Sequence, residues 1–597
     1  MGAKQAISAK TVAELAKLRE QVLEGAANNA DAAQVDEANR LSANNMAQYL
    51  ELRNHDVRQL QSQLAKAGLS SLGRVEPHVL ASIDAVYLAS AALNDQTHQE
   101  LEENKLSFDL GNELLQLRTT ELLGEPNGDR YTRIMVTLPS EAALDGALVE
   151  RIIEAGAEVI RINCAHDDET AWLQMIDHVK VASKKLDRKV TITMDLAGPK
   201  LRTGQIELGE GVLKLRPTRN ELGEVTASAR AIITANPEEF TASDVAVVPV
   251  LDGKWINRLK PGSEIHFRDA RGAHRELQVL EAKPNGVIVE SNKTSYIVAG
   301  IELVASHHQT EVAAIGGTPK KVTLHVGDAL ILVPGEEPAD LAQSPIRLGC
   351  SLPEAFRDAQ VGQRIFFDDG MSAGIIEHAS KEELHVRIIE AAPGGTKLAE
   401  AKGINLPDTN LDLPALTEDD LKNLPFIVEH ADAVSLSFVR SPSDVLNLQE
   451  KLTALGGRDL GVILKIETVS GFKNLPKILF AAMRWPKNGV MIARGDLAVE
   501  AGYQRLAELQ EEIMWLCEAA HIPVIWATQV LDTLGRTGHP SRAEVTDAAM
   551  SSRAECVMLN KGPYVDTAVA FLNRVLARMD EHQHKKQSLM RQLTSWD

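Results

Sequence analysis

The feature that most constrains the fold is a regular alternation of short apolar runs with helical patterns, which begins at Arg133. Each run has the length of one strand and is apolar on both faces, as expected for a parallel strand covered on both sides. Between the runs, apolar residues recur at helical spacing, for example at Leu144, Leu148 and Ile152. The runs that we predict to be strands are 133–138, 158–164, 189–196, 433–439, 461–467, 489–495, 523–528 and 556–560.

These strands form about eight β/α units, the number that closes a barrel, so the sequence predicts an α/β fold built on a (β/α)8 TIM barrel. In such barrels the functional residues collect at the carboxyl ends of the strands. The polar residues of this chain follow that rule, because they come at or just after the ends of the predicted strands: Arg161, Asn163, Asp195, Ser437, Lys465, Glu467, Asp496, Thr528 and Gln529.

The alternation is interrupted at 205–402 by short strands of alternating pattern, with turns carried by Gly and Pro. This pattern predicts an inserted all-β lid domain. The insert also resembles itself, because residues 261–269 match 361–369 and residues 300–303 match 403–406. Such self-similarity predicts two tandem modules, which we place roughly at 205–305 and 306–402.

Residues 1 to about 122 carry helical patterns, and Thr11 with Glu14 predicts a capping box at a helix start. This segment carries no recognisable chemistry, and we expect a docking or oligomerisation domain. A Gly-Glu-Pro-Asn-Gly linker follows at 124–128. The predicted domains are an N-terminal α-helical domain, the barrel and the lid domain, with bounds 1–128, then 129–204 with 403–597, and 205–402.

Composition excludes several classes of partner. The net charge of −20 over 597 residues argues against a general nucleic-acid partner. No apolar stretch approaches the ~18 residues of a membrane span, and the N-terminus lacks the pattern of a secretory signal. Four cysteines are scattered without metal-ligand spacing, so we expect reduced thiols and a cytoplasmic protein.

Three charged residues at neighbouring strand ends are the strongest functional signal. Glu467 and Asp496 offer two carboxylates, which suit a hard divalent cation such as magnesium. Lys465 lies near them, and a fixed lysine suits a phosphate or an oxyanion. A structural ion-pair cluster would also explain a lone Lys-x-Glu, but three charges at adjoining barrel strands indicate a site.

Seven segments, taken in order, resemble the pyruvate kinase family. Any one of them would be weak, but their order and the position of the lid make the set specific. The resemblance covers about 131–583. The segments that carry it are 161–166 (Arg-Ile-Asn-Cys-Ala-His), 195–204, 402–407, 465–467 (Lys-Ile-Glu), 493–497 (Ala-Arg-Gly-Asp-Leu), 527–529 (Ala-Thr-Gln) and 540–544 (Pro-Ser-Arg-Ala-Glu).

The resemblance implies a glycolytic phosphotransferase that converts phosphoenolpyruvate and ADP to pyruvate and ATP. Glu467 and Asp496 would then hold Mg2+ or Mn2+, and Lys465 would stabilise charge on the phosphoryl group. The backbone of Gly495 and Asp496 would bind the substrate carboxylate. Thr528 would serve the protonation of enolpyruvate, relaying a proton through water.

The same resemblance assigns the nucleotide side of the site. Arg161 would grip the transferred phosphate with its planar fork and take part in catalysis. Arg202 would reach the nucleotide phosphates, and Lys402 would contact ADP from the lid hinge. Asn163 and His166 complete the implied nucleotide-binding set.

Departures from the family pattern concern potassium. Most pyruvate kinases hold K+ with four side chains, and two of them are replaced here by Ala165 and Leu196. Lys200 stands where potassium-dependent members carry a glutamate, which resembles the potassium-independent branch. An ammonium group on a flexible stem can supply the missing positive charge. We therefore expect Lys200 to substitute for potassium and K+ not to be required. Asp195 and Asn163 would orient Arg161 and this lysine.

The chain stops soon after the eighth predicted helix, so we expect the family's C-terminal regulatory domain to be missing. The lid is about twice the usual size. We also expect a homo-oligomer, formed through the barrel or the N-terminal helical domain, and no nucleic-acid or membrane partner.

Two other functions stay open at this point. One is a magnesium-dependent lyase of 2-oxo acids on the same barrel, although a lyase needs no nucleotide clamp of the kind that Arg202 and Lys402 suggest. The other is a catalytically silent sensor that binds phosphoenolpyruvate, although the intact Lys465, Glu467 and Thr528 argue against lost turnover.

Overall fold

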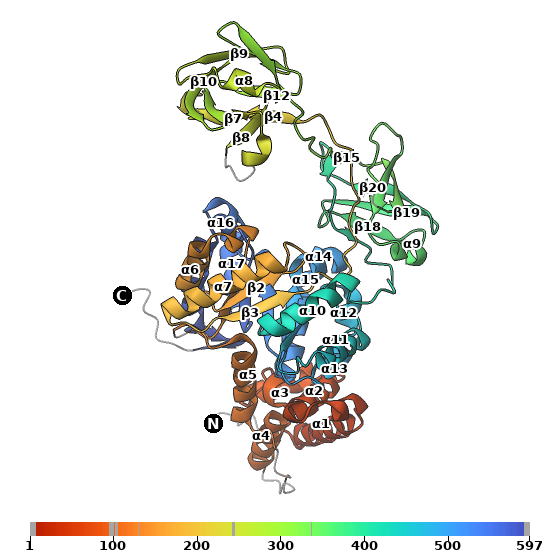
Figure 1. Cartoon of the computed structure of the whole chain (residues 1–597). Helices are drawn as coiled ribbons and strands as arrows, with labels where there is room; N and C mark the ends of the chain where they lie inside the picture. Colours follow the sequence, from red (N-terminus) through yellow and green to blue (C-terminus); the bar gives the residue numbers. More distant parts are fainter. Residues whose placement is uncertain are drawn as a thin grey trace. The chain divides into compact units, whose positions relative to one another are not determined.

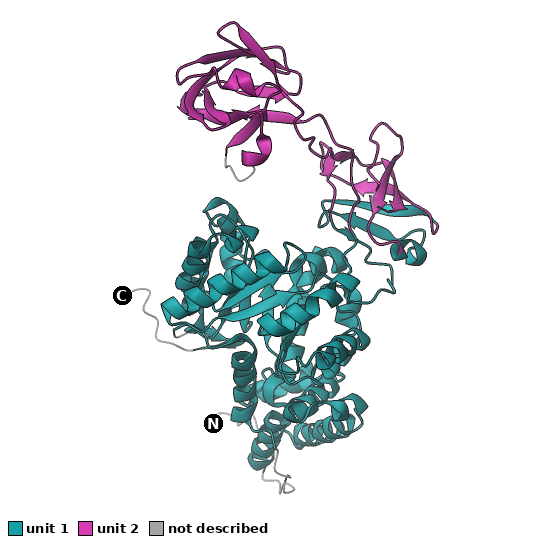
Figure 2. Cartoon of the chain, viewed as in Figure 1, with its two compact units in different colours: residues 1–201, 354–379, 403–597 teal, residues 202–353, 380–402 magenta. Residues whose placement is uncertain are grey.

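The computed structural model describes residues 7–94, 101, 105–128, 130–240, 245–335 and 337–589. The chain forms two compact units (Figure 2). The first unit comprises residues 1–201, 354–379 and 403–597, and the second comprises 202–353 and 380–402. Residues 354–379, which we assigned to the insert from the sequence, therefore group with the first unit, as do the N-terminal helices.

The first unit contains a closed barrel of parallel strands in the order β1-β2-β3-β23-β24-β25-β26-β27. The predicted (β/α)8 barrel is thereby confirmed. Each predicted strand is present, with ends that differ by at most three residues. The strands are β1 (Arg133–Thr137), β2 (Val159–Asn163), β3 (Thr191–Asp195), β23 (Ala433–Leu436), β24 (Gly461–Ile466), β25 (Asn488–Ala493), β26 (Val524–Ala527) and β27 (Cys556–Leu559).

Helices follow the barrel strands and surround the barrel (Figure 1). Three of them start with a capping box, in which Thr417, Ser441 or Ser541 pairs with an acidic residue three positions later. The helices are α6 (Gly146–Ala155), α7 (Glu169–Leu186), α10 (Glu418–His430), α11 (Pro442–Ala454), α12 (Val469–Lys473), α13 (Leu475–Ala482), α14 (Arg494–Ala501), α15 (Tyr503–Ala519), α16 (Asp532–Thr537), α17 (Arg542–Ser551) and α18 (Val565–Asp580).

The N-terminal region is helical, as predicted, with α1 (Ala9–Ala27), α2 (Arg40–Arg53), α3 (Arg58–Lys66), α4 (Val79–Leu93) and α5 (Phe108–Leu123). Its apolar residues and those of the barrel helices form one continuous core. The capping box predicted at Thr11 is wrong, because α1 begins earlier. Ser8 is the cap, and its hydroxyl accepts a hydrogen bond from the amide of Thr11.

Buried hydrogen bonds attach the N-terminal helices to the barrel. The side-chain amide of Asn39 donates to two backbone carbonyls beyond the end of α13. Asn45 donates to the carbonyl of Ala519 at 2.9 Å. His521 of the barrel bonds to the hydroxyl of Ser42 and to the carbonyl of Pro77, each at 2.8 Å. These hydrogen bonds join the N-terminal helices to the barrel of the same chain.

The end of α5 closes the amino-terminal mouth of the barrel. Leu122 and Leu123 are buried in one cluster with the inward-facing residues of the barrel strands. Gly461 and Gly489 permit this approach, because a Cβ at either position would lie 2.5 Å from a methyl group of Leu122. Any larger residue there would displace the leucine.

The second unit contains a first β module with its own apolar core. It has a seven-stranded sheet in the order β14-β13-β9-β10-β11-β7-β8 and a separate pair formed by β4 and β12. The elements are β4 (Val212–Leu215), β5 (Thr218–Arg219), β6 (Val225–Ala227), β7 (Ala229–Thr234), β8 (Ala246–Pro249), α8 (Gly253–Ile256), β9 (Glu264–Arg268), β10 (His274–Lys283), β11 (Gly286–Ser291), β12 (Ser295–Val298), β13 (Glu302–Ala305) and β14 (His308–Glu311).

The later strands of the insert repeat these pairings. In the second unit β16 pairs in parallel with β17 and antiparallel with β20, as β7 does with β8 and β11. In the first unit β18 pairs antiparallel with β19 and β22, as β9 does with β10 and β13. The elements are β15 (Val322–Leu324), β16 (Ala329–Pro334), β17 (Ile346–Cys350), α9 (Glu354–Asp358), β18 (Arg364–Phe367), β19 (Ser372–Ala379), β20 (Leu384–Glu390), β21 (Thr396–Leu398) and β22 (Ile404–Asn405).

The chain enters and leaves the first β module through two adjacent segments. The amide of Gly209 donates to the carbonyl of Thr318 at 2.9 Å. A Cβ at Gly211 would lie only 2.1 Å from the carbonyl oxygen of Ile315. We call this paired segment, residues 208–211 with 315–320, the stem of the module.

The C-terminal part of the described chain ends in a short hairpin of β28 (Gln583–His584) and β29 (Gln587–Ser588). Across the described residues, no helix is both long enough and apolar enough to span a membrane.

Candidate active site

Lys465 stands at the centre of the charged groups at the carboxyl ends of the barrel strands. Its ammonium donates to the hydroxyl of Ser437 at 2.8 Å. It lies 3.2 Å from a carboxylate oxygen of Glu467 and 3.6 Å from one of Asp195. Because only 12% of its side chain is exposed, these interactions are weakly screened.

Arg161 and Asp195 form a buried pair beside this lysine. The guanidinium of Arg161 donates to Asp195 Oδ2 at 2.8 Å and to the hydroxyl of Thr137 at 2.9 Å. Burial opposes ionisation of Asp195, but the charges of Arg161 and Lys465 outweigh it and hold the pKa of that carboxyl below its ordinary value. Asp195 is therefore an anion that fixes both cations.

Glu467 is buried and accepts a hydrogen bond from the backbone amide of Phe438. Burial, reinforced by the charge of Asp496, raises the pKa of Glu467 above its ordinary value, although Lys465 opposes the shift. Such a carboxylate gains from additional positive charge nearby. Glu467 and Asp496 provide the hard oxygen donors that magnesium prefers, so their chemistry fits that ion.

Two carboxylates do not complete a coordination sphere. Among the described residues, no group of three or more His, Cys, Asp or Glu side chains could hold a metal ion. A magnesium ion at Glu467 and Asp496 would therefore take its other ligands from substrate and water, which is common for this ion.

Lys200 contacts Asp496 directly. Its ammonium lies 2.9 Å and 3.2 Å from the two carboxylate oxygens. Burial would lower the pKa of Lys200, but Asp496 outweighs it and raises the pKa above its ordinary value, so the ammonium stays charged. Asp195, which we expected to orient Lys200, contacts Arg161 and Lys465 instead.

Thr528 is held in place by Arg494, a residue to which the sequence assigned no role. Thr528 has a positive φ of 66°, a conformation that costs a β-branched residue energy. The guanidinium of Arg494 donates to its carbonyl at 2.6 Å and pairs with both carboxylate oxygens of Asp547. The hydroxyl of Thr528 accepts a hydrogen bond from the amide of Gly495 at 2.8 Å.

Three of the predicted residues line one cavity of about 300 Å3. They are Arg161 within β2, Asn163 at its end and His166 just after it. Asn560 and Lys561, just after β27, line the same cavity. We predicted no role for this pair from the sequence.

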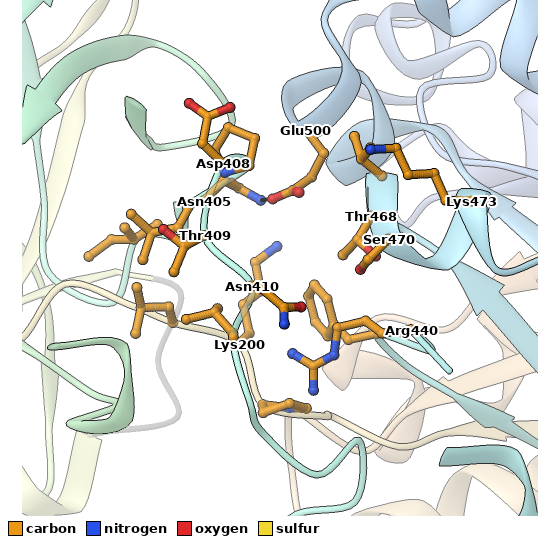
Figure 3. Close-up of a pocket in the computed structure, with 18 residues that line it drawn as sticks. Lys200, Asn405, Asp408, Thr409, Asn410, Arg440, Thr468, Ser470, Lys473 and Glu500 are labelled. Atoms are coloured by element: carbon orange, nitrogen blue, oxygen red, sulfur yellow. Dashed lines mark hydrogen bonds between the residues drawn. The ribbon is translucent and has the colours of Figure 1, made fainter. Parts of the chain in front are cut away.

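A second cavity, of about 240 Å3, lies beside Lys200 (Figure 3). Polar side chains around it include Asn405, Arg440, Thr468 and Glu500, which Figure 3 shows arranged around a common space. Burial raises the pKa of Glu500 to about 7, against the hydrogen bond that it accepts from Asn405 at 3.2 Å.

Arg202 and Lys402 lie at the first and last residues of the second unit. They are neighbours there, because the amide of Thr203 donates to the carbonyl of Lys402 at 2.8 Å. The guanidinium of Arg202 donates to the carbonyl of Ala401 at 3.0 Å. The structure thus brings these two predicted nucleotide-binding residues together within that unit.

Residues 129–315 and 288–564 match a family model described as pyruvate kinase, barrel domain. The chain belongs to that family. The two matches overlap at residues 288–315, so part of the first β module is matched twice. All the candidate site residues of the pyruvate kinase barrel lie within the matched ranges.

Pyruvate kinases from several organisms are similar to this chain. A pyruvate kinase of Clostridium acetobutylicum is 32% identical over 43% of this chain and 53% of its own length. The rat protein named pyruvate kinase PKLR is 26% identical over 76% of this chain and 61% of its own length. A pyruvate kinase of Methanocaldococcus jannaschii is 37% identical over 37% of this chain and 48% of its own length. The chain thus spans about half to three-fifths of these relatives.

Proposed function

We propose that this member of the pyruvate kinase family transfers the phosphoryl group of phosphoenolpyruvate to ADP. The observation that carries the proposal is the position of the Lys465 ammonium between the carboxylates of Asp195 and Glu467, with Arg161 paired to the same aspartate. Preorganised cations at a strand end stabilise charge that develops on a phosphoryl group in flight.

In this proposal the bond between the enol oxygen and phosphorus breaks as a terminal oxygen of ADP bonds to the same phosphorus. Arg161 grips the phosphoryl oxygens with its fork, and Lys465 neutralises charge as the group moves. Magnesium or manganese would be held by Glu467 and Asp496. When bound, the metal supplies a Lewis acid that draws charge from the substrate oxygens.

Enolpyruvate must then take up a proton at its terminal carbon to become pyruvate. We propose that Thr528 relays this proton through water. The amides of Gly495 and Asp496 belong to the first turn of α14, where backbone N–H groups lack helical partners and suit a carboxylate. The Gly495 amide donates to the Thr528 hydroxyl in this structure, so the substrate carboxylate would replace that contact. The position of Thr528 and the amides at the start of α14 both support a site for the three-carbon acid between Lys465 and Thr528.

We assign the nucleotide to Asn163, His166, Arg202 and Lys402. The cavity shared by Arg161, Asn163 and His166 supports this assignment for the barrel residues. The hydrogen bonds that keep Arg202 and Lys402 adjacent support a joint role for the other two.

We propose that K+ is not required and that Lys200 supplies the corresponding positive charge. Two oxygen-bearing side chains expected around potassium are absent at Ala165 and Leu196. The raised pKa of Lys200 keeps its ammonium charged beside the proposed metal ligand Asp496. Asp195 would act on this charge only indirectly, by fixing Arg161 and Lys465.

We propose that the 205–402 insert consists of two modules related by duplication. The repeated strand pairings and the double match of residues 288–315 support this reading. Gly209 and Thr318 are adjacent at the two ends of the first β module, which supports the insertion of this module into the segment that leads to the second one. We propose that residues 1–128 form a helical domain that packs on the barrel through a shared apolar core and buried hydrogen bonds.

We further propose a cytoplasmic homo-oligomer that associates through the barrel. All four cysteines are free, which is compatible with a reducing compartment. Apolar residues are exposed at and near α6 and α7, where Leu144 is 87% and Val181 67% exposed. Exposed apolar side chains suit a protein–protein interface. Sedimentation of the wild type and of a Val181→Glu variant tests it.

A coupled assay of the full chain tests the proposed activity. Phosphoenolpyruvate, ADP and Mg2+ should yield pyruvate and ATP in equal amounts, and chelation of the metal should stop the reaction. A 2-oxo-acid lyase would instead cleave its substrate without ADP. A silent sensor would bind phosphoenolpyruvate in a calorimeter and form no pyruvate.

A further inference from the structure

A third cavity, of about 320 Å3, lies between the N-terminal helix α2 and the barrel helices α12, α13 and α15. None of the proposed catalytic or nucleotide-binding residues lines it. Three aromatic rings do, namely Tyr49, Phe472 and Trp515. We call it the aromatic cavity. Its size and apolar lining are those of a site for a small molecule.

Two cations lie at this cavity. Arg53 and Lys473 are exposed residues of its lining, accompanied by one exposed carboxylate, Glu512. The Arg53 guanidinium donates to the hydroxyl of Tyr49 at 3.0 Å and lies 5.1 Å from the ring centre of Trp515. Positive charge set against aromatic faces favours a flat ligand that carries a negative charge.

The indole of Trp515 adds an independent observation. Its Nε1 is buried, and it has no hydrogen-bond partner within the part of the chain that the structure describes. A buried donor without an acceptor destabilises the protein that contains it. The N–H is not exposed to solvent, so a ligand oxygen reaches it, and removes that penalty, only if the indole ring turns toward the cavity.

We propose that the aromatic cavity binds a planar aromatic anion, a ring carboxylate or sulfonate, as a regulatory ligand. The ring packs among Phe472, Tyr49 and Trp515. The anionic group faces Arg53 and Lys473, and a turn of the indole ring lets the N–H of Trp515 donate to one of its oxygens. The excess of cations over Glu512 selects an anion over a neutral ring.

Helix α12 connects this cavity to the candidate active site. Phe472 and Lys473 line the aromatic cavity, whereas Thr468, Ser470 and Lys473 line the cavity of Figure 3. Thr468 caps α12 and directly follows Glu467 in the chain. A ligand that packs against Phe472 therefore contacts α12, the helix that follows the proposed metal ligand Glu467.

The helix has little room to yield on its other side. A Cβ at Gly471 would lie 2.4 Å from the carbonyl oxygen of Val439. Helix α12 is therefore packed tightly against the segment that follows β23. A displacement of α12 is therefore passed on to the segment around Glu467. By linkage, the aromatic anion and the substrate of the barrel change each other's affinity by the same factor.

Calorimetric titration of the full chain with naphthalene-2-sulfonate tests the site, with 2-naphthalenemethanol as the uncharged match. We expect saturable binding of one sulfonate per chain and much weaker binding of the alcohol. Arg53→Gln should weaken binding by about tenfold, the loss of one charged hydrogen bond. Trp515→Phe keeps a ring but removes the N–H, and it should weaken binding by about fivefold.

Lys477→Gln is the matched control, since Lys477 is an exposed α13 residue outside the cavity lining, and it should bind like the wild type. Lys473→Gln is a second surface variant if Trp515→Phe proves unstable. No saturable binding, equal binding of the alcohol, or unchanged affinity in Arg53→Gln and Lys473→Gln would overturn the proposal.

Amide hydrogen exchange tests the connection without any need for turnover. The sulfonate should slow exchange in residues 468–473 of the wild type and leave Arg53→Gln unchanged. This readout stands apart from pyruvate formation, so a failed activity assay and a failed regulatory site can be told apart. Slower exchange limited to α2 and α15 would show that the site lacks the proposed coupling.

Discussion

The ammonium of Lys200 lies 2.9 Å from one carboxylate oxygen of Asp496 and 3.2 Å from the other. The proposed metal ligand therefore has a fixed cationic partner before any divalent ion arrives. A cation so close to Asp496 lowers the repulsion between that residue and Glu467. It also means that the affinity for the metal depends on where Lys200 moves when the ion binds.

Replacement of Lys200 tests its proposed role. Lys200→Glu places a third carboxylate beside Asp496 and Glu467, so we expect a large loss of activity without potassium. Added K+ should partly restore the rate. Initial rates in tetramethylammonium buffer, with and without K+, provide the measurement. Strong activation of the wild type by K+ would contradict the proposal.

Lys465→Met should separate binding from chemistry. Loss of a preorganised cation costs about 100-fold or more in the rate of phosphoryl transfer. Binding of phosphoenolpyruvate should stay largely intact, because Arg161 still grips the phosphate. Calorimetry gives the affinity and the coupled assay gives kcat, with Lys477→Met as an exposed control. Equal losses of affinity and rate would indicate a structural ion pair.

Arg494→Lys should disturb the position of Thr528 while leaving the side chains that are proposed to bind the substrate unchanged. Lysine keeps the charge, but its compact ammonium cannot match the planar fork with which Arg494 donates to the Thr528 carbonyl and to both oxygens of Asp547. We expect kcat to fall by about 10- to 100-fold, with a much smaller change in KM, the range for a mispositioned proton relay. Arg505→Lys, at an exposed surface arginine, should keep both constants. A change in KM alone would contradict a role in positioning Thr528.

His521 should make the docking of the N-terminal helices sensitive to acid. Burial lowers the pKa of His521 to about 3, whereas an unfolded histidine titrates near 6.5. Between these two pKa values the unfolded chain binds one more proton than the folded protein does. The free energy of unfolding should therefore fall by up to ~1.4 kcal/mol per pH unit as the pH drops. Melting temperatures at pH 7.5 and 5.0 measure the effect.

Two variants isolate this histidine from the other groups that titrate in the same range. His521→Gln should lose less stability between pH 7.5 and 5.0 than the wild type does. His539→Gln, at an exposed histidine, should behave like the wild type. An identical pH dependence in all three proteins would show that His521 does not control the docking.

The first β module should be removable at its stem. A chain that lacks residues 210–317 joins Gly209 directly to Thr318, whose backbone atoms are already hydrogen-bonded. We expect this variant to fold and to keep the proposed phosphoryl-transfer activity within about tenfold, since Arg202 and Lys402 remain and short connections close at little entropic cost. A deletion shifted to 240–290 cuts through the module core and should aggregate. Complete loss of activity in a folded 210–317 deletion would place a catalytic role in the module.

The barrel could be predicted from the sequence because each strand carries its own local pattern. Val462, Ile463 and Leu464 form a run that is fully buried in the structure, and the polar residues that follow such runs lie at the functional end of the barrel. Strand positions and the clustering of Lys465 with Glu467 therefore needed no knowledge of distant contacts.

The interactions between distant segments could not be predicted in this way. Arg494 and Asp547 are 53 residues apart, and no spacing rule relates them. The same holds for His521 and Ser42, whose hydrogen bond depends on the packing of α15 against α2. The positive φ of Thr528 is likewise a product of its tertiary partners.

The stem of the first β module affects how cooperatively the chain unfolds. The module has its own apolar core, and its ends meet at one pair of hydrogen-bonded segments. Two parts of a chain unfold cooperatively when they share extensive packing, and a stem of two paired segments provides little packing between the module and the rest of the chain. Heating should therefore produce more than one calorimetric transition, and the ratio of van't Hoff to calorimetric enthalpy for the whole chain should fall below one. A partly melted species, with an ordered barrel and a disordered module, would then be a state that this chain populates under stress.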